Sequence, residues 1–234
     1  MCPKYKKIAS DIEKDIISGV YNETKKLLTE EFLVKRFNVS RTTIRKAINI
    51  LVHKGYIYQI QGSGMFLKEA VFKNYINLEN TYGDIISDNE ESVDRRTIKI
   101  EIEQATQNIA QKLQCNQGTA LYYVERINYV NNIPMSIQYS YFIKDVIPYL
   151  NSDIVEDSIQ SYILNDLKQN IGYLDKVIYA DKLSFEEAKV LNLKIDDPSL
   201  IIESTASLSN GKIFEWSKDV YNYKEARFLK TVNC

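Results

Sequence analysis

Apolar residues recur at helical spacing in three segments before residue 55, which predicts three amphipathic helices. The first helix covers about residues 5–18, and Gly19 ends it. Thr29 is placed to cap the second helix, because its hydroxyl can accept from free backbone N–H groups, and Ser40 is placed to cap the third. The apolar stripes of the three helices are Ile8, Ile12 and Ile16; Leu33, Val34 and Phe37; and Ile44, Ala47, Ile48 and Leu51.

A hairpin pattern follows the third helix. Residues 56–60 and 65–67 have strand-like sequences, and Gly62 and Gly64 between them favour a tight turn. The second and third helices are separated only by the short turn Asn38-Val39. Two short helices joined by such a turn, with a hairpin beside them, are typical of a winged helix-turn-helix that places its last helix in a DNA major groove.

Beyond residues 1–68, which we call the head, the pattern of apolar residues changes twice. Residues 69–96 have no regular apolar period, and the stretch from Asp84 to Asp94 is acidic, which predicts a linker. From residue 97 onward, alternation at Ile98, Ile100 and Ile102 predicts a strand with one buried face. The elements predicted after it are a helix at 105–113, strands at 121–130 and 135–142, helices around Val146 and at 159–167, a strand at 177–183, a helix from Ser184 to about Leu193 that opens with a capping box, and strands at 200–208 and 212–221.

Residues 97–234, which we call the body, contain an internal repeat. A shift of 79 residues places Leu121 on Leu200 and Asn131 on Asn210 without a gap. The repeat predicts two β-α-β-β units that form one antiparallel sheet covered by helices, an α+β fold. We therefore expect a DNA-binding domain at 1–68, a linker at 69–96 and a second domain at 97–234.

Charge divides the chain in the same place. Residues 1–70 carry 13 Lys/Arg and 7 Asp/Glu, a net charge of +6, whereas residues 71–234 carry the remaining 17 and 24, a net charge of −7. A basic head on an acidic body predicts a polyanionic partner for the head alone.

Composition also narrows the chemistry. The three cysteines, Cys2, Cys115 and Cys234, are far apart and odd in number, so they predict no disulfide framework and fit a reducing cytoplasm. His53 is the only histidine, which argues against two-histidine metal sites and a histidine-based catalytic triad. We expect no metal, no cofactor and no catalytic residue, and no apolar run approaches the roughly 18 residues of a membrane span.

The third helix carries the residue types that DNA recognition requires. Arg41 and Arg45 on its outer side can form bidentate bonds to guanine O6 and N7. Thr42, Thr43 and Lys46 suit phosphate oxygens, which fix the register of the protein on DNA without reading sequence. The alternative is a basic helix face that is merely solvated. The predicted DNA-binding set is Ser40, Arg41, Thr42, Thr43, Arg45 and Lys46 on the helix, with Gln61, Gly62, Ser63 and Gly64 on the wing.

Three short motifs mark this part of the chain: Leu27-Leu28-Thr29-Glu30, Val39-Ser40-Arg41-Thr42-Thr43-Ile44-Arg45 and Gln61-Gly62-Ser63-Gly64-Met65-Phe66. In these motifs, residues 5–67 resemble the winged-helix domain of the GntR superfamily of bacterial repressors. The sequence departs from the family pattern in two places: Leu28 replaces a proline at the entry to the second helix, and Glu31 stands where members often carry a DNA-contacting arginine. A carboxylate cannot bind guanine O6 and N7, so that base contact is not carried over.

A second set of motifs lies beyond the linker: Val124-Glu125-Arg126-Ile127, Ile133-Pro134, Tyr139-Ser140-Tyr141-Phe142, Asp157-Ser158-Ile159 and Phe214-Glu215-Trp216-Ser217 with Tyr221. In these motifs, about residues 95–230 resemble the effector-binding UTRA domain of the HutC subfamily, which has a chorismate-lyase-like fold. In relatives that sense sugar phosphates an arginine pair grips the anion; Arg126 matches one member, Asn128 stands at the other, and Gln138 replaces a common glutamate. The resemblance implies effector contacts from Arg126, Asn128, Gln138, Tyr139, Tyr141, Ser158, Glu215 and Tyr221. The alternative for each tyrosine of the set is that it fills the core or a dimer interface.

Together these patterns predict a cytoplasmic homodimeric repressor that a small molecule, such as a sugar phosphate, releases from operator DNA. Two alternatives come from other functional classes. One is a lyase-like enzyme fused to a DNA-binding head, since fold alone does not fix function. The other is an architectural DNA-binding protein that takes no ligand.

Overall fold

The computed structural model describes residues 3–53, 55–68, 76–78 and 93–230. In the head, the three predicted helices are present as α1 (Lys4–Ile17), α2 (Glu30–Phe37) and α3 (Arg41–His53). The predicted cap of α2 is confirmed, because the backbone N–H of Phe32 donates to Thr29 Oγ1 over 3.3 Å. Asn38 then adopts a left-handed conformation and ends α2, which turns the chain into α3.

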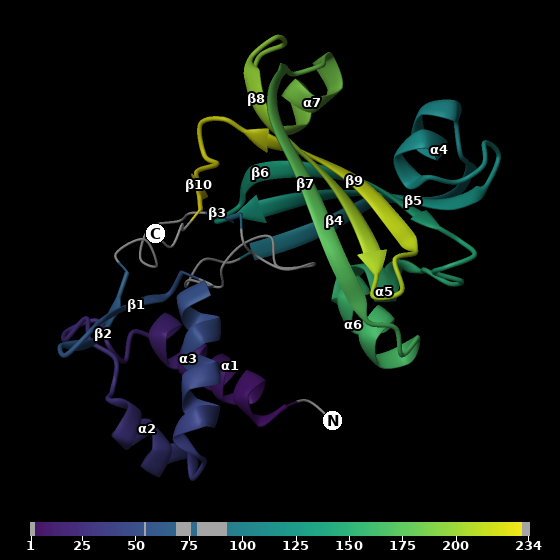
Figure 1. Cartoon of the computed structure of the whole chain (residues 1–234). Helices are drawn as coiled ribbons and strands as arrows, with labels where there is room; N and C mark the ends of the chain where they lie inside the picture. Colours follow the sequence, from purple (N-terminus) through teal and green to yellow (C-terminus); the bar gives the residue numbers. More distant parts are fainter. Residues whose placement is uncertain (1–2, 54, 69–75, 79–92, 231–234) are drawn as a thin grey trace. The chain divides into compact units, whose positions relative to one another are not determined.

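The predicted wing is also present. Strands β1 (Ile57–Ile60) and β2 (Gly64–Leu67) pair antiparallel, with Ile57 opposite Leu67 (Figure 1). Lys26 forms an isolated bridge with Phe66, which ties the segment before α2 to the wing. The predicted apolar stripes meet in one core, whose fully buried members include Ile12, Ile16, Leu33, Ile44, Ile48, Leu51 and Ile57.

The body is one six-stranded antiparallel sheet with the order β4-β5-β6-β9-β8-β7 (Figure 1). The two halves of this order are the two predicted repeats, β4-α4-β5-β6 and β7-α7-β8-β9, joined where β6 pairs with β9. The element bounds are β4 Val93–Gln104, α4 Gln107–Leu113, β5 Ala120–Val130, β6 Ile133–Ile143, β7 Ile171–Lys182, α7 Phe185–Val190, β8 Pro198–Leu208 and β9 Ile213–Asn222.

Helices cover both faces of this sheet. We call one the α5 face, because α5 (Ser152–Asp157), α6 (Ile159–Ser161) and the π-helix Tyr162–Asp166 pack on it around Phe142. We call the other the α4/α7 face, because α4 packs there around Trp216 and α7 packs there around Val220. The register assigns even-numbered positions of β5 and β6, from 122 to 128 and from 136 to 142, to the α5 face.

Several elements differ from their predictions. The helix predicted around Val146 is wrong, because residues 144–147 form a turn in which Val146 and Ile147 both donate to the Ile143 carbonyl. Pro148 explains the difference, since a residue that precedes proline disfavours helical backbone. Strand β7 begins at Ile171, well before the predicted start at residue 177.

Two stretches inside the predicted linker are strands. Residues 93–96 already belong to β4. Strand β3 (Ile76–Asn77) pairs in parallel with β10 (Phe228–Leu229), close to the end of the described chain. The acidic stretch predicted between Asp84 and Asp94 lies almost wholly outside the described residues.

Candidate functional site

The start of α3 is built as the sequence predicts for a recognition helix. The backbone N–H of Thr43 donates to Ser40 Oγ over 3.2 Å, and the two hydroxyls lie 2.9 Å apart. This bonding engages the hydroxyls of Ser40 and Thr43, whereas Thr42 is exposed and points away from the core. Of the three predicted hydroxyl contacts, Thr42 is therefore the one whose side chain is most available to a phosphate.

Arg41 and Arg45 both project from the outer side of α3. Their side chains are 64% and 66% exposed, and each forms an ion pair with a carboxylate at the start of α2. Arg41 Nη2 lies 2.9 Å from Glu31 Oε1, and Arg45 Nε lies 3.0 Å from Glu30 Oε2. Exposed ion pairs contribute only about 0–1 kcal/mol, so either arginine can exchange its partner for a DNA group at little cost.

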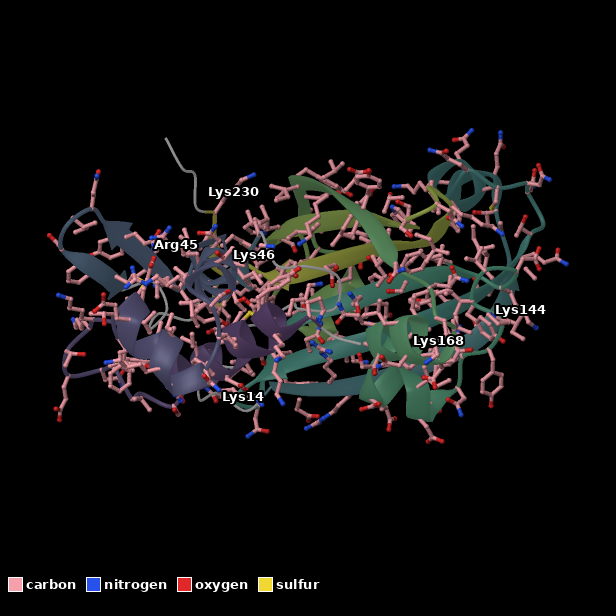
Figure 2. The ribbon with its side chains drawn as sticks, turned by 60° about the horizontal axis from the view of Figure 1, so that its bottom comes forward. Lys14, Arg45, Lys46, Lys144, Lys168 and Lys230 are labelled. Atoms are coloured by element: carbon pink, nitrogen blue, oxygen red, sulfur yellow. The ribbon has the colours of Figure 1, made fainter. Side chains whose placement is uncertain are left out.

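The basic surface of α3 extends one residue further. Lys46 is exposed next to Arg45, as Figure 2 shows for these two labelled side chains, and its Nζ lies 5.8 Å from the centre of the Tyr5 ring. Together with Arg41 and Arg45, this places three cations on one side of the helix that carries the predicted DNA contacts.

Glu31 has a partner that the sequence did not reveal. Its carboxylate, at the position where the resemblance implies an arginine, binds the guanidinium of Arg41. A glutamate at this position therefore does more than remove a base contact, because it also occupies the guanidinium of Arg41. A bound DNA must either displace Glu31 from Arg41 or use the carboxylate itself as an acceptor.

The tip of the wing is exposed at Gln61, Gly62 and Ser63. Gly62 and Gly64 have φ angles of +79° and +120°, which L-residues rarely adopt, so the turn depends on glycine. A Cβ on Gly64 would lie 2.9 Å from Lys26 Cε. Lys26 therefore adds a cation beside the wing that the sequence analysis did not include, although the pair Lys25-Lys26 was visible.

The predicted effector residues divide between the two faces of the sheet. On β5 and β6, Arg126 lies opposite Gln138 and Asn128 lies opposite Ser136, all on the α5 face. Tyr221 and Glu215 on β9 join them, because they lie opposite Ser136 and Phe142. Tyr139 and Tyr141 occupy odd positions of β6 and lie on the α4/α7 face.

The two tyrosines are partly buried and pack against apolar side chains of the α4/α7 face. Tyr141 lies 5.8 Å from Trp216 and 5.0 Å from Tyr123, ring centre to ring centre, and Tyr139 packs against the apolar cluster under α7. Burial is the main cause that raises the pKa of both hydroxyls above the ordinary tyrosine value. Since the sheet separates them from Arg126, one small molecule on the α5 face cannot contact the whole predicted set.

Arg126 is held by a network on the α5 face. Its Nε donates to Gln138 Oε1 over 3.1 Å, its Nη2 donates to the same oxygen, and its Nη1 donates to the Val155 carbonyl over 3.3 Å. Because arginine can only donate, Gln138 presents its oxygen to Arg126 and turns its NH₂ group away. That NH₂ group hydrogen-bonds the carboxylate of Asp219 on β9.

Asp219 is a residue that the sequence analysis missed. It is 5% exposed, and desolvation by burial raises the pKa of its carboxyl to about 7, against the lowering effects of Gln138 and Arg126. A perturbed carboxyl among convergent polar side chains is typical of a functional site. The strand register could have found it, since Asp219 lies directly opposite Gln138.

Ser158 begins α6 above this face. Its Oγ accepts from the Ser161 N–H over 3.1 Å, so Ser158 caps the helix. The helix has only three residues before the π-helix begins, which leaves little helix dipole for an anionic group of an effector at Ser158.

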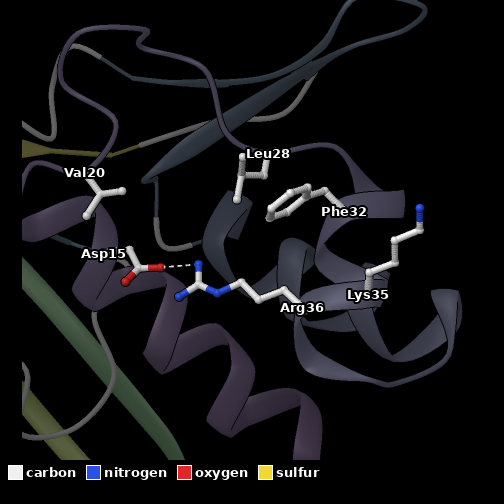
Figure 3. A pocket seen from close by; sticks show the side chains of 6 residues that line it. All are labelled: Asp15, Val20, Leu28, Phe32, Lys35 and Arg36. Atoms are coloured by element: carbon white, nitrogen blue, oxygen red, sulfur yellow. Dashed lines mark hydrogen bonds and ion pairs between the residues drawn. The ribbon is translucent and has the colours of Figure 1, made fainter.

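A separate depression of about 690 Å³ lies on the head (Figure 3). Apolar side chains of Val20, Leu28 and Phe32 line it, and the ion pair between Arg36 and Asp15, at 2.5 Å, crosses one side. Lys35 is the one further charged side chain of its lining, so its mainly apolar chemistry differs from that of the α5 face.

The described residues contain neither a candidate metal site nor a helix that could span a membrane. Within them, no three side chains of His, Cys, Asp or Glu lie together as a metal ion would require. None of their helices combines the length and apolar character needed to cross a bilayer.

Comparison with known proteins matches both parts of the chain. The family model described as "Bacterial regulatory proteins, gntR family" matches residues 4–67, and the "UTRA domain" model matches residues 90–227. The HTH-type transcriptional regulator YydK of Bacillus subtilis is 35% identical over 230 residues, covering 98% of each chain. Its crystal structure matches with a TM-score of 0.79 and 33% identity, covering 99% of this chain and 100% of that one.

More distant relatives are named as repressors. The HTH-type transcriptional repressor NagR of B. subtilis is 25% identical over 97% of this chain and 93% of its own. The mannosyl-D-glycerate transport/metabolism system repressor MngR of Escherichia coli is 27% identical over 97% of this chain and 94% of its own. All of these relatives are regulators, which sets aside the enzyme alternative.

Proposed function

The chain belongs to the GntR family of bacterial regulatory proteins, in the HutC subfamily that carries a UTRA domain, and from this premise we propose that it is a repressor which a small polar effector releases from operator DNA. It is a transcription regulator with a DNA-binding helix-turn-helix and an effector-binding domain. The proposal adds the direction of control, the chemistry of release and action in the cytoplasm.

The exposed guanidinium groups of Arg41 and Arg45 carry the DNA-binding part of the proposal. Both lie on the outer side of α3, next to a glycine-dependent wing, and both have carboxylate partners that they can exchange. We assign base reading to these two arginines. Thr42, Lys46 and the wing residues Gln61 to Gly64 contact phosphates in this proposal, while Ser40 and Thr43 hold the start of the helix.

Fluorescence anisotropy tests this assignment, with an operator that is first selected from random DNA duplexes by its binding to the protein. Arg45→Ala should weaken binding by roughly 5- to 150-fold, the equivalent of about 1–3 kcal/mol. Lys14→Ala is the matched control, because Lys14 is an exposed cation on α1 of the same head, away from Arg45 (Figure 2). Equal binding by the Arg45 variant and the Lys14 variant would remove Arg45 from the interface.

The effector part of the proposal rests on the polar α5 face. Arg126, Gln138, Asn128, Glu215 and Tyr221 share that face, whereas the paired tyrosines of β6 do not. MngR is named for mannosyl-D-glycerate, a polyhydroxylated acid, and we extend that chemistry to this chain as an anionic, hydroxyl-bearing ligand such as a sugar phosphate. An effector can release DNA only if it binds the DNA-free state more tightly than the DNA-bound state.

A thermal-shift screen of sugar phosphates, amino acids and nucleosides should find the ligand class, since a ligand stabilises the state it binds. Arg126→Ala should then bind operator DNA normally and lose the response to the compound. Normal release of that variant from DNA would move the effector site elsewhere.

We also propose that the protein acts as a homodimer, because helix-turn-helix repressors read two half-sites about one helical turn apart. Supporting this, the edge strand β7 carries exposed apolar side chains on one side, at Tyr173, Val177 and Tyr179. Sedimentation measurements on the intact chain and on Val177→Lys test the proposal. A wild-type chain that stays monomeric at micromolar concentration would contradict it.

A further inference from the structure

Unpaired polar atoms gather on one face of the sheet. Within the described part of the chain, five buried side-chain oxygens lack a hydrogen-bond partner, and four of them are Thr97 Oγ1, Asn128 Oδ1, Ser140 Oγ and Asp219 Oδ1. The register places all four on the α5 face, the face of Arg126. Because about 90% or more of buried polar groups in proteins have a partner, four such atoms on one face need an explanation.

The four atoms also surround one point of the sheet, the facing pair Arg126 and Gln138. Thr97 lies opposite Arg126 and Asp219 lies opposite Gln138, while Asn128 and Ser140 lie two residues further along the strands of the pair. Neighbouring strands lie about 4.8 Å apart and residues rise about 3.3 Å along a strand, so Thr97 and Asp219, and likewise Asn128 and Ser140, are separated by about 14 Å. This span matches a molecule of one or two sugar rings rather than a single ion.

The neighbours of Asp219 fix which group remains free. Gln138 uses its oxygen for Arg126 and its NH₂ group for the Asp219 carboxylate. Asp219 is therefore held in place through one contact, while Oδ1 keeps its full capacity to accept. Asn128 is similar, because its NH₂ group donates to Ser136 Oγ over 2.9 Å and its Oδ1 stays free.

We propose that Asp219, with Asn128 and Ser140, forms an acceptor cluster around Arg126 and Gln138 that recognises hydroxyl or ammonium hydrogens of the effector, and that Asp219 decides which effectors are accepted. This inference rests on the proposed effector site and adds the chemistry that the ligand must present. An amide oxygen and an ionised carboxylate can only accept, so the part of the ligand that faces Asn128 Oδ1 and the ionised form of Asp219 must donate. Arg126 and Lys176 on the same face supply positive charge for an anionic group elsewhere on the ligand.

The charges around Asp219 support this assignment. Burial and, to a lesser extent, Glu215 raise the pKa of its carboxyl, Gln138, Arg126 and Lys176 lower it, and the resulting pKa is about 7. Near neutral pH the carboxyl therefore exists in both forms. A donor from the ligand favours the ionised form, which then makes a charge-assisted hydrogen bond.

The test uses the intact protein, its selected operator and three named probes. Glucose 6-phosphate offers hydroxyl donors, glucosamine 6-phosphate adds an ammonium donor, and inorganic phosphate offers the anion without either kind of sugar donor. Binding is measured by titration calorimetry at pH 7.5 for the wild type and for Asp219→Asn, which keeps the size of the side chain. Asp175→Asn is the matched control, because Asp175 is exposed at an odd position of β7.

We expect at least one sugar phosphate to bind the wild type and to bind Asp219→Asn about 10- to 100-fold more weakly, as for a lost hydrogen bond to a charged group. Inorganic phosphate should bind both proteins equally, and Asp175→Asn should behave as the wild type. A larger loss for glucosamine 6-phosphate than for glucose 6-phosphate identifies ammonium as the preferred donor. The reverse order identifies a hydroxyl.

Other outcomes overturn the inference without touching the proposed regulator. Equal sugar-phosphate affinities of wild type and Asp219→Asn would mean that ordered water alone satisfies the acceptor cluster. Ser140→Ala provides a second variant with a minimal change, and unchanged binding there as well would complete the refutation. A wild type that binds the operator but neither sugar phosphate would overturn this ligand chemistry, whereas a wild type that binds no operator would overturn the proposed function itself.

Discussion

Replacing Asp219 by asparagine should change how the stability of the body depends on pH, even without an effector. The substitution keeps the shape of the side chain and removes its proton. Burial raises the pKa of this carboxyl from 3.8 to about 7 in the folded protein, so the folded state binds the proton more tightly than the unfolded state. Because the pKa differs between the folded and unfolded states, the free energy of unfolding depends on pH.

The sign follows from the proton count. Between pH 3.8 and about 7 the folded state holds a proton that the unfolded state has lost, so the contribution of Asp219 to stability falls as pH rises through this window. Each pKa unit corresponds to about 1.36 kcal/mol, so the part lost between pH 5 and pH 8 is about 2–3 kcal/mol. The amide of the variant does not titrate and has no such dependence. The free energy of unfolding of Asp219→Asn minus that of the wild type should therefore increase by about 2–3 kcal/mol from pH 5 to pH 8.

Urea unfolding at pH 5, 6, 7 and 8 measures this difference. Trp216 is the only tryptophan of the chain and is buried in the body, so its fluorescence reports the unfolding of the body rather than of the head. Asp175→Asn serves as the control and should run parallel to the wild type, because Asp175 is exposed. A difference that stays constant with pH, or that grows toward pH 5, would refute the reasoning.

Three further substitutions test other parts of the structure. Glu31→Gln should strengthen operator binding by roughly 2- to 10-fold at low salt, as measured by fluorescence anisotropy. The melting temperature should stay nearly unchanged, because the exposed ion pair with Arg41 contributes little to folding. Weaker operator binding by this variant would instead mean that the Glu31 carboxylate contacts DNA. Gly64→Ala should destabilise the head by about 1–3 kcal/mol and Gly62→Ala by less, as measured by calorimetric melting. The reason is that only Gly64 combines a φ of +120° with a close neighbour. A larger loss of stability for Gly62→Ala than for Gly64→Ala would mean that the wing rearranges. Ser184→Ala should cost about 1 kcal/mol by urea unfolding, through loss of the capping box, and an unchanged midpoint would contradict that role.

The head could be predicted almost completely from the sequence, because local rules suffice there. Each helix combines an apolar stripe at helical spacing with a hydroxyl cap or a glycine stop, and Thr29 and Ser40 cap as expected. The hairpin turn also follows from its glycines. What the pattern could not provide is the partner of each arginine, since Glu31 and Arg41 are ten residues apart and meet only when α2 and α3 pack together.

The body shows where local rules fail. Strand β7 lies at an edge of the sheet, so most of its side chains are exposed and its first half lacks an apolar alternation. Its start was therefore predicted too late. The helix predicted around Val146 failed for a different reason, because two apolar residues before a proline can fill a core as a turn.

The residues that share the α5 face could not be predicted from the sequence of any single strand. Arg126 and Tyr139 both look like binding residues, yet whether they share a face depends on the pairing register of β5 and β6. A shift of one residue would exchange the faces. Asp219 was missed for the same reason, since a carboxylate between Lys218 and Val220 resembles an ordinary exposed position until the register places it opposite Gln138.

The arginines proposed for the two binding functions have one physical feature in common. Arg41 and Arg45 pair with carboxylates of the protein itself, and Arg126 donates to Gln138 and to the Val155 carbonyl. A ligand that offers only negative charge must replace these bonds and gains little net free energy. A ligand with matching geometry gains more, because it makes bidentate or multiple hydrogen bonds in exchange. The internal partners therefore lower affinity for any polyanion and favour the ligands that fit, so removal of Glu31 should raise binding to unrelated duplexes more than binding to the operator.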